Sequence, residues 1–589
     1  MQQEKKPSLL SRFGFPTYPE INVALKTLSQ RDKKLFFIFF IVFIISAIGA
    51  LITFNDSISV EVPKFAGTLN IGIIGTPRFI NPILEMSDAD RDITALVYSS
   101  LMRTGSDGKL WLDLASDYSE SEDGLSYTFT LKKDAVFHDG KPVTSDDVIF
   151  TIAQIKDPAM KSPKRASWEG VEVEKIDDKT LKFTLAQPYA PFLENTTLGI
   201  LPQHIWAEAS SGLMSFSEFN INPIGSGPYK IAKINKNSSG IVTSYVLDAN
   251  KDFSLGRPFI KNLMVTFYPN EEKLLNALQN GEISTIGGIS PKNMSSLKKD
   301  NSNINILTLP RIFGVFFNQN NAPLFAKKEV RLALSEATDK QKIIETMLMG
   351  FGVEIDSPLP PGTLGAITPE NQNGKEETWG EKIEKARKIL EQSGWKLNEK
   401  DNVFEKKSGK ETTRLEFSIS TSNVPELKQT GELIKSMWEE LGAKVDLKIF
   451  EVSDLNQNVI RPRKYDALIF GEILSHDPDP FAFWHSSQRN DPGLNIALYT
   501  NIMVDKLLEE ARKTKDPAER EKKYLKFQEE VRKDSPAVFL YSPSYIFLTP
   551  KSLKGFDTKN ITLPSERFND IYKWHLETKK VWKILSNIN

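Results

Sequence analysis

The chain has 589 residues, which exceeds what one hydrophobic core usually supports, so at least two lobes are expected. Its 75 lysines and arginines nearly balance its 76 aspartates and glutamates, and no basic run dominates, so a nucleic-acid partner is not expected. The absence of cysteine excludes disulfides, thiolate metal sites, cysteine nucleophiles and a lipid-anchoring cysteine.

The first predicted element is a membrane-spanning helix at residues 35–54, LFFIFFIVFIISAIGALITF. This segment carries no charge, and about 20 apolar residues suffice to span a bilayer. A cleavable signal peptide would have a shorter apolar region of about 7 to 15 residues, and a buried core helix would seldom stay uncharged on all faces. Arg31, Lys33 and Lys34 precede the segment, so the positive-inside rule predicts a cytoplasmic tail at residues 1–34 and an extracytoplasmic main domain.

The stretch VFHDGKPVTSDDV, residues 136–148, contains metal-type ligands but predicts a connection from a strand to a helix. The preceding LSYTFTLK alternates apolar and polar residues, which is typical of a half-buried strand. Gly140 and Pro142 favour a turn, and Thr144 with Asp147 can cap a following helix. Because only one imidazole is present, a structural role is favoured over a metal site.

The second half of the chain predicts an open α/β lobe. A helix is expected in KIEKARKILEQSGW, residues 382–395, where apolar residues share one face up to Gly394. RLEFSIST, residues 414–421, predicts a strand, and a helical stripe then ends at Gly442 before a further strand at 445–449. A strand, helix and strand in this order predict a parallel pair.

The segment YDALIFGE, residues 465–472, predicts a ligand-binding edge of the sheet. Ala467–Phe470 is a continuous apolar run, typical of a strand that is buried on both faces. Gly471 and Glu472 are expected just past its carboxyl end, where open α/β sheets bind small molecules. The alternative is that Glu472 is a solvated or helix-capping carboxylate.

The segment HDPDPFAFWH, residues 476–485, could be read as a metal site, but its prolines predict a rigid turn. His476 and His485 lie nine positions apart and no nearby region supplies a third imidazole, so neither a metal nor another cofactor is expected. The aromatic residues Phe481, Phe483 and Trp484 are typical of a core, although one of them could face a ligand.

Catalysis is not predicted. The five histidines are scattered, the chain has no G-x-S-x-G motif, and no pair of carboxylates stands in an obvious strand-end arrangement. The glycines of IGSGPYKI, residues 224–231, lack the lysine and hydroxyl residue of a phosphate loop. Gly225 and Gly227 are instead expected to allow a tight backbone bend beside a cleft.

Five segments, in this order, carry a resemblance to a known family. They are GLSYTFTLKKDAVFHDGKPVTSDDVIFTI (124–152), LPQHIW (201–206), IGSGPYKI (224–231), FFNQNNAPLFAKKEVRLALSEATDKQKII (316–344) and HDPDPFAFW (476–484). The chain resembles the family 5 extracytoplasmic solute-binding proteins, the dipeptide- and oligopeptide-binding components of ABC importers. The resemblance covers roughly residues 67–576.

The resemblance implies a fold in the α/β class: a two-lobed clamp like that of periplasmic binding proteins, with one discontinuous lobe, here preceded by a transmembrane helix. It implies residues 58–312 and 536–589 for lobe I and residues 313–535 for lobe II. The expected partners are a peptide ligand, the permease subunits of an ABC transporter and the membrane, with the protein itself a monomer. The alternatives are an oligosaccharide or a metal complex as ligand, and a role as an extracytoplasmic sensor or chaperone.

The resemblance also implies candidate ligand-binding residues. Peptide-binding members of the family place an acidic residue, which pairs with the ligand's α-amino group, shortly before the segment that matches HDPDPF. The matching position is Glu472, although aspartate is common there and the spacing to Asp477, the reserve candidate, is one residue longer. Asn318 and Arg331 belong to a family-like boundary motif, and Arg331 is interpreted as part of a structural ion pair. The full candidate set is Glu472, Gly471, Asp477, Phe481, Trp484, Asn318, Gly225 and Gly227.

Overall fold

A computed structural model describes residues 18–207, 211–296, 302–367 and 377–585. The chain divides into two compact units. One consists of Met1–Lys64 with Glu577–Asn589, and the other of Phe65–Leu576.

The first unit contains the helices α1 (Tyr18–Thr27) and α2 (Gln30–Ile58). The side chain of Ser29 caps α2 by accepting a hydrogen bond from the backbone N–H of Asp32 at 3.3 Å. α2 has 29 residues, which at 1.5 Å per residue makes it about 43 Å long. It is long and apolar enough to cross a membrane, and none of its residues is buried.

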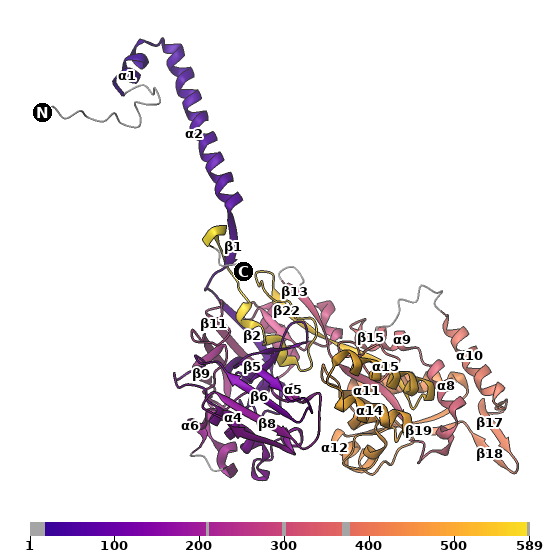
Figure 1. Ribbon diagram of the computed structural model, residues 1–589. Helices are drawn as coiled ribbons and strands as arrows, with labels where there is room; N and C mark the ends of the chain where they lie inside the picture. Colours follow the sequence, from indigo (N-terminus) through magenta and orange to yellow (C-terminus); the bar gives the residue numbers. More distant parts are fainter. Residues whose placement is uncertain (1–17, 208–210, 297–301, 368–376, 586–589) are drawn as a thin grey trace. The chain divides into compact units, whose positions relative to one another are not determined.

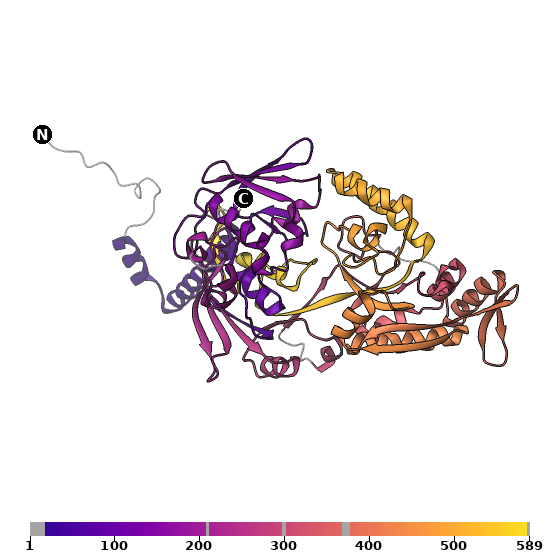
Figure 2. The same ribbon diagram turned by 90° about the horizontal axis from the view of Figure 1, so that it is seen from below.

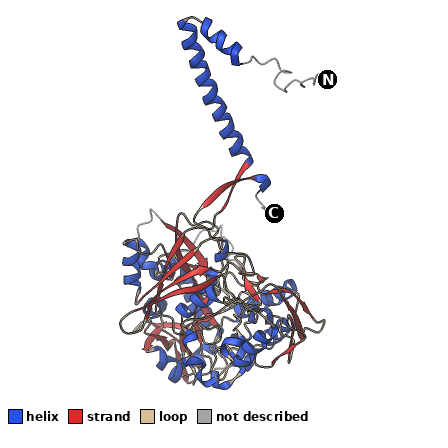
Figure 3. Ribbon diagram, turned by 90° about the vertical axis from the view of Figure 1, so that its left-hand side faces the viewer, coloured by secondary structure: helices blue, strands red, loops and turns tan. Residues whose placement is uncertain are grey.

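A two-stranded ribbon follows α2 in the same unit (Figure 3). β1 (Ser59–Pro63) pairs antiparallel with β23 (Thr578–Trp582). The indole N–H of Trp582 donates to Asn55 Oδ1 at 2.9 Å, and Lys580 forms an ion pair with Asp56 at 2.8 Å. The C-terminal strand therefore packs on the residues that directly follow the apolar part of α2.

In the second unit the described residues form a sheet of 12 strands, and β22 (Ala537–Pro550) runs through both of its halves (Figures 1 and 2). The order β20-β19-β21-β14 lies on one side of β22 and β12-β2-β11-β10-β9 on the other, while β13 and β15 also pair with β22. The strands are β2 Thr68–Ile74, β9 Tyr229–Lys236, β10 Val242–Ala249, β11 Asn262–Tyr268, β12 Thr285–Gly287, β13 Ser302–Thr308, β14 Arg311–Phe317, β15 Gly352–Glu354, β19 Glu416–Ser422, β20 Lys444–Phe450 and β21 Ala467–Ile473.

Lobe I has a core drawn from residues 69–309 and from residues 545–574, so this lobe is discontinuous in sequence. A four-stranded sheet in the order β5-β6-β8-β7 and the pair β3-β4 extend it. These strands are β3 Met102–Thr104, β4 Leu110–Leu112, β5 Ala115–Glu120, β6 Ser126–Leu131, β7 Val171–Lys175 and β8 Thr180–Leu185. The helices are α3 Asp88–Val97, α4 Ser145–Lys156, α5 Phe192–Asn195, α6 Gln203–Trp206 and α7 Glu271–Gln279.

Lobe II has two cores, drawn from residues 312–541. Its helices are α8 Lys328–Glu336, α9 Lys340–Leu348, α10 Trp379–Gln392, α11 Pro425–Leu441, α12 Val452–Asp454, α13 Phe481–Trp484, α14 Ile502–Lys513 and α15 Pro517–Asp534, and a small sheet contains β16 Lys396–Asn398, β17 Val403–Ser408 and β18 Glu411–Arg414. β19 and β20 are parallel, with α11 between them in the sequence, which confirms the predicted strand–helix–strand unit.

The chain crosses from one lobe to the other at two neighbouring strands, β14 and β22. The core assignment changes from lobe I at Leu309 to lobe II at Ile312, the second residue of β14. On the return it changes between Tyr541 and Tyr545, inside β22. Arg331 secures this return, but not through the predicted ion pair: its guanidinium donates to backbone carbonyls, including that of Ser535 at 3.0 Å, just before β22.

The predicted strand, turn and capped helix around His138 are confirmed. β6 precedes the turn, and the backbone N–H of Thr144 donates to Asp147 Oδ2 at 2.8 Å at the start of α4. The His138 ring is hydrogen-bonded to the segment IGSGPYKI, residues 224–231. The Gly225 N–H donates to its Nδ1 at 3.3 Å, and its Nε2 lies 3.1 Å from the carbonyl oxygen of Gly227. Burial lowers the pKa of His138 to about 4, so the ring is neutral and structural.

Replacement of Gly225 tests this packing. A Cβ at Gly225 would lie 2.1 Å from the carbonyl oxygen of Val97, so Gly225→Ala must displace the backbone at the end of α3. We expect a loss of about 1–3 kcal/mol in the free energy of unfolding, measured by urea denaturation of the purified protein. Gly380→Ala is the control, because nothing lies within 4 Å of a Cβ there. Equal stability of the two variants would contradict the packing.

Candidate ligand-binding site

Gly471 and Glu472 lie within the last three positions of β21, which ends at Ile473, and not beyond the strand as predicted. The apolar run that predicted the strand is extended because β21 stays paired with β14 up to Ile473, which is opposite Arg311. Gly471 is opposite Phe313. A Cβ at Gly471 would lie 2.8 Å from the Phe313 ring, which stacks on Tyr541 with 5.2 Å between centroids. The sheet, rather than a loop, therefore positions Glu472.

Glu472 is a buried acid without a partner. It is 3 % exposed, and neither of its carboxyl oxygens has a hydrogen-bond partner among the described residues. Burial raises the pKa of Glu472 well above its ordinary value of 4.5, and the nearby Trp484 side chain lowers it only in part. Since the indole N–H of Trp484 itself forms no hydrogen bond of ordinary geometry, the environment favours the neutral carboxylic acid.

A cavity of about 460 Å³ opens beside Glu472 in lobe II, within the range of small-molecule sites. The two cationic side chains that line this cavity, Arg461 and Arg463, already have partners. Arg463 donates to backbone carbonyls, including that of Gly493 at 2.6 Å, and Arg461 lies 3.9 Å from Asp491. Among the described residues, Glu472 is thus the charged lining group of this cavity that lacks a partner. The cavity also has an apolar wall of Ile460, Phe470, Phe483, Leu494 and Ile496.

Asp477, the reserve candidate, is committed to another interaction. It forms an ion pair with Arg520, whose side chain is 5 % exposed and also donates to the carbonyl oxygen of Lys515 at 3.2 Å. Asp477 does not line the cavity beside Glu472. The structure therefore assigns this aspartate to fixing its own loop.

The aromatic residue that lines the cavity is not one of the two predicted ligand-binding residues, Phe481 and Trp484. The Phe481 ring lies between the Arg512 guanidinium, 3.8 Å from its centroid, and the His485 ring at 4.0 Å. Trp484 is 1 % exposed and belongs to the core of lobe II. Phe483, which was not singled out as a site residue, is the aromatic residue of this segment that lines the cavity.

The HDPDP loop, residues 476–480, is a point of contact between the lobes. The backbone N–H of Asp477 donates to Glu194 Oε1 of lobe I at 3.3 Å, and the hydroxyl of Tyr189 donates to Asp479 Oδ2 at 3.3 Å. Asp479 is in turn held by Arg512 Nε at 2.9 Å. Sequence reasoning treated this loop as a possible ligand or metal site, because the lobe I side of the contact is remote in sequence.

Asn318, Gly225 and Gly227 do not line the cavity beside Glu472. The Asn318 carboxamide donates to the carbonyl of Arg463 at 2.9 Å and accepts from two N–H groups of the turn after β14. Through Arg463 it supports one wall of the cavity. The two glycines instead allow the chain to pass close to the backbone of Val97 in lobe I.

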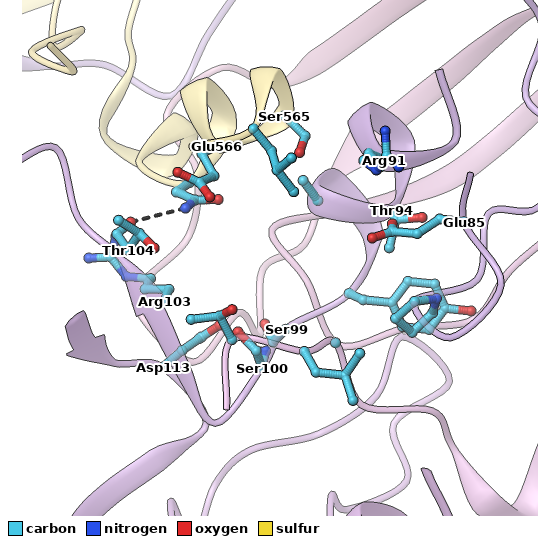
Figure 4. A pocket seen from close by; sticks show the side chains of 18 of the residues that line it. Glu85, Arg91, Thr94, Ser99, Ser100, Arg103, Thr104, Asp113, Ser565 and Glu566 are labelled. Atoms are coloured by element: carbon cyan, nitrogen blue, oxygen red, sulfur yellow. Dashed lines mark hydrogen bonds between the residues drawn. The ribbon is translucent and has the colours of Figure 1, made fainter. Parts of the chain in front are cut away.

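A second cavity, of about 340 Å³, lies in lobe I (Figure 4). Its walls come from the end of α3, the strand β3, the region of α5 and the helical turn η11 (Pro564–Phe568). Figure 4 shows Glu566 and Ser565 of η11 on one side of the open space and Thr94 and Glu85 on another. No sequence motif predicts this cavity, because it is assembled from segments up to several hundred residues apart.

Potential metal ligands do not converge within the described ranges. No three histidine, aspartate or glutamate side chains there are grouped so that they could hold one ion. His476 Nδ1 lies 2.7 Å from the carbonyl of Gly362, and His485 Nδ1 lies 2.7 Å from the hydroxyl of Ser487. Both imidazoles of the HDPDPFAFWH segment thus have structural partners.

Comparison with known proteins identifies the family. The family described as bacterial extracellular solute-binding proteins, family 5 Middle, matches residues 109–493. The chain belongs to the family 5 solute-binding proteins. It is 30 % identical over 526 residues to the oligopeptide-binding protein AppA of Bacillus subtilis, covering 88 % of this chain and 93 % of AppA.

Solved structures of relatives share the two-lobed fold. The structure of AppA from Bacillus subtilis in complex with a nonapeptide matches with a TM-score of 0.65 and 28 % identity, over 88 % of this chain and all of that one. NikZ from Campylobacter jejuni, in complex with Ni(L-His), matches with a TM-score of 0.66 and 28 % identity over 87 % of this chain and all of NikZ. These two relatives thus hold ligands of different chemical classes.

The pH dependence of stability tests the environment of Glu194 at the lobe contact. Burial first, and then the negative charges of Asp477 and Glu566, raise the pKa of Glu194 from 4.5 to about 8. The folded protein therefore keeps this proton to a higher pH than the unfolded chain, so the associated stability is complete below about pH 4.5 and is lost as the pH rises towards about 8.

We expect Glu194→Gln, which keeps an acceptor for the Asp477 N–H, to lose less stability than the wild type between about pH 5 and pH 8. Urea unfolding at a series of pH values measures the difference. Glu122→Gln, at an exposed position, should keep the wild-type slope. A wild-type slope in Glu194→Gln would show that Glu194 ionises normally in the folded protein.

Proposed function

We propose that this protein is a membrane-anchored extracytoplasmic receptor that encloses peptides between its two lobes and delivers them to the permease of an ABC importer. Membership of family 5 and the similarity to an oligopeptide-binding protein support a peptide ligand. The AppA complex supports enclosure of a peptide within this fold. The protein acts as a monomer in this proposal.

The observation that carries the proposal is the unpaired carboxyl of Glu472. A free peptide brings an ammonium group at its N-terminus, and enclosing that charge without a partner is strongly unfavourable. Glu472 offers the complementary group, since it is buried, lines a cavity and has no hydrogen-bond partner among the described residues. In the complex the carboxyl ionises beside the ammonium, and the cost of burying each charge falls.

The rest of the cavity suits peptides of varied sequence. A receptor of broad scope cannot match every side chain, so it gains affinity from the constant parts of the ligand, the backbone and the charged end. The apolar wall of Phe470, Phe483 and Ile496 accepts a side chain without demanding a particular polar group. Affinity then comes from the anchor and from closure of the lobes.

We propose residues 58–312 with 536–589 as lobe I and residues 313–535 as lobe II, joined through β14 and β22. The change of core assignment at β14 and within β22 supports a hinge in this region. The contact of Asp477 with Glu194 then belongs to the closed side of the clamp. Closure brings the loop of residues 476–480 against lobe I.

We further propose that α2 is retained as an anchor with residues 1–34 in the cytoplasm. The uncharged run and the basic residues before it support this topology. The ribbon of β1 and β23 gives further support, because Trp582 and Lys580 bond to Asn55 and Asp56 at the polar end of α2. Tryptophan and lysine are favoured at the level of lipid headgroups.

The alternative ligands are a metal complex and an oligosaccharide. The similarity to NikZ keeps a metal complex open as a ligand class. The described residues of this chain group no three potential metal ligands, whereas they leave one buried acid ready for an organic cation. This combination favours a peptide.

The Glu472→Gln variant tests the anchor. Removing one member of a buried charge pair usually costs about 2–5 kcal/mol, so we expect free peptides to bind the variant more weakly by that amount. N-acetylated peptides lack the ammonium, so they should bind the wild type poorly and lose little more in the variant. Calorimetry with both proteins and both peptide forms gives a double-mutant cycle.

Two controls accompany this cycle. Glu432→Gln, on the exposed face of α11, should bind both peptide forms as the wild type does. Oligosaccharides and nickel–histidine should give no heat of binding. Equal losses for free and acetylated peptides in Glu472→Gln would show that Glu472 does not meet the amine.

The mass of the mature protein tests the anchor at the membrane. We expect the protein extracted from membranes to retain its N-terminal residues, because α2 is the anchor. Intact-mass spectrometry measures this directly. A product that starts near Asp56 would show that the segment is removed and would refute the anchor.

A further inference from the structure

The cavity of lobe I has a charge arrangement that the proposed peptide function does not explain. Its cations are all paired with acids. Lys164 lies 2.7 Å from Glu85, and Arg103 lies 2.7 Å from Asp570. The remaining cation, Arg91, forms an ion pair with Asp88 at 3.0 Å.

Three acids that line this cavity form no ion pair among the described residues, namely Asp113, Glu194 and Glu566. Both oxygens of Asp113 already accept hydrogen bonds, from the Ser100 N–H and the Ser254 hydroxyl at 3.2 Å, which leaves Glu194 and Glu566. Glu194 Oε1 accepts only a long bond from the N–H of Asp477, at 3.3 Å, and Glu566 Oε2 accepts from the N–H of Thr562 at 2.8 Å. These hydrogen bonds come from backbone N–H groups and not from cations. Burial raises the pKa of Glu566 to about 7, and burial followed by the charges of Asp477 and Glu566 raises that of Glu194 to about 8.

Unpaired neutral groups on the same walls point independently to a ligand. Thr94 Oγ1 and the Tyr98 hydroxyl are buried without a hydrogen-bond partner, in side chains that are 6 % and 5 % exposed. Both residues line the cavity, and Figure 4 shows Thr94 across the open space from Glu566. Buried hydroxyls normally have a partner, so two unpaired ones in one cavity indicate that a polar group is to be bound there.

The cavity lies next to the cleft between the lobes. Glu194 receives its hydrogen bond from Asp477 of lobe II, and Glu566 also lines a small gap with His476 of that lobe. A ligand held between the lobes can therefore extend a group past these two acids. The groups that line the cavity do not form a metal site, since no three acids or histidines are grouped around one point in the described part of the chain.

We propose that the cavity of lobe I binds a cationic group of the ligand, the ammonium or guanidinium of a lysine or arginine side chain, between Glu194 and Glu566, with the Thr94 and Tyr98 oxygens as further acceptors. This inference rests on the proposed peptide function and narrows it to peptides that carry a basic side chain. The α-ammonium meets Glu472 in lobe II, and the basic side chain meets the two acids of lobe I.

Matched peptides test this selectivity on the full chain in detergent. One position at a time carries lysine, arginine, norleucine or Nε-acetyl-lysine, and calorimetry gives the dissociation constant of each peptide. We expect the wild type to prefer lysine or arginine over norleucine at one position by about tenfold or more, since hydrogen bonds to charged groups are among the stronger ones.

Glu194→Gln and Glu566→Gln should each reduce this preference to about threefold or less, while the affinity for the norleucine peptide changes by less than about twofold. The exposed Glu122→Gln should keep the full preference. Equal loss for lysine and norleucine peptides in the two cavity variants would overturn the inference. So would a preference that follows the peptide's N-terminal amine, measured by acetylation, instead of its side chain.

The outcomes separate this inference from the function on which it rests. Wild-type binding of peptides without any preference for a basic side chain overturns the inference and leaves the proposed function intact. Failure of every peptide to bind overturns the proposed function and the inference with it. Retained preference in both cavity variants would assign the basic side chain to another part of the cleft and overturn the inference.

Discussion

The ligand preference proposed for this protein depends on carboxyl groups that are buried without a cationic partner. Ionising such a group in an apolar environment is costly, so it stays protonated until an opposite charge arrives. Glu472 meets this condition in lobe II, and Glu194 with Glu566 meet a milder form of it in lobe I. The free protein thus holds acids that a cationic ligand would ionise.

The large sheet determines where Glu472 lies relative to the two lobes. β21 carries Glu472, β14 pairs with β21, and β22 pairs with β14 before it continues into lobe I. The acid is therefore two strands away from the strand that joins the lobes. Glu472 thus lies on a strand that is paired with β14 along its length. The loop of residues 476–480, fixed by ion pairs of its own, provides the contact with lobe I.

Local patterns in the sequence were sufficient for the elements but not for the site. Periodicity and capping predicted α4, α11 and the parallel pair of β19 and β20 correctly. The predicted end of β21, at Phe470, was three residues too early. Pairing with β14 extends the strand beyond the point where the apolar composition ends. Asp477 and Glu194 could not be related by any spacing rule, since 283 positions separate them and only the packing of two lobes brings them together.

The central claim is that a cationic ligand ionises buried acids when it binds. Calorimetry of a lysine-containing peptide at pH 7, repeated in buffers of different ionisation enthalpy, counts the protons that binding releases. The account predicts net release of protons by the wild type, and less release by Glu472→Gln, because the amide has no proton to give up. Binding with no release of protons, or with uptake, would show that these carboxyl groups are already ionised in the free protein and would contradict the account.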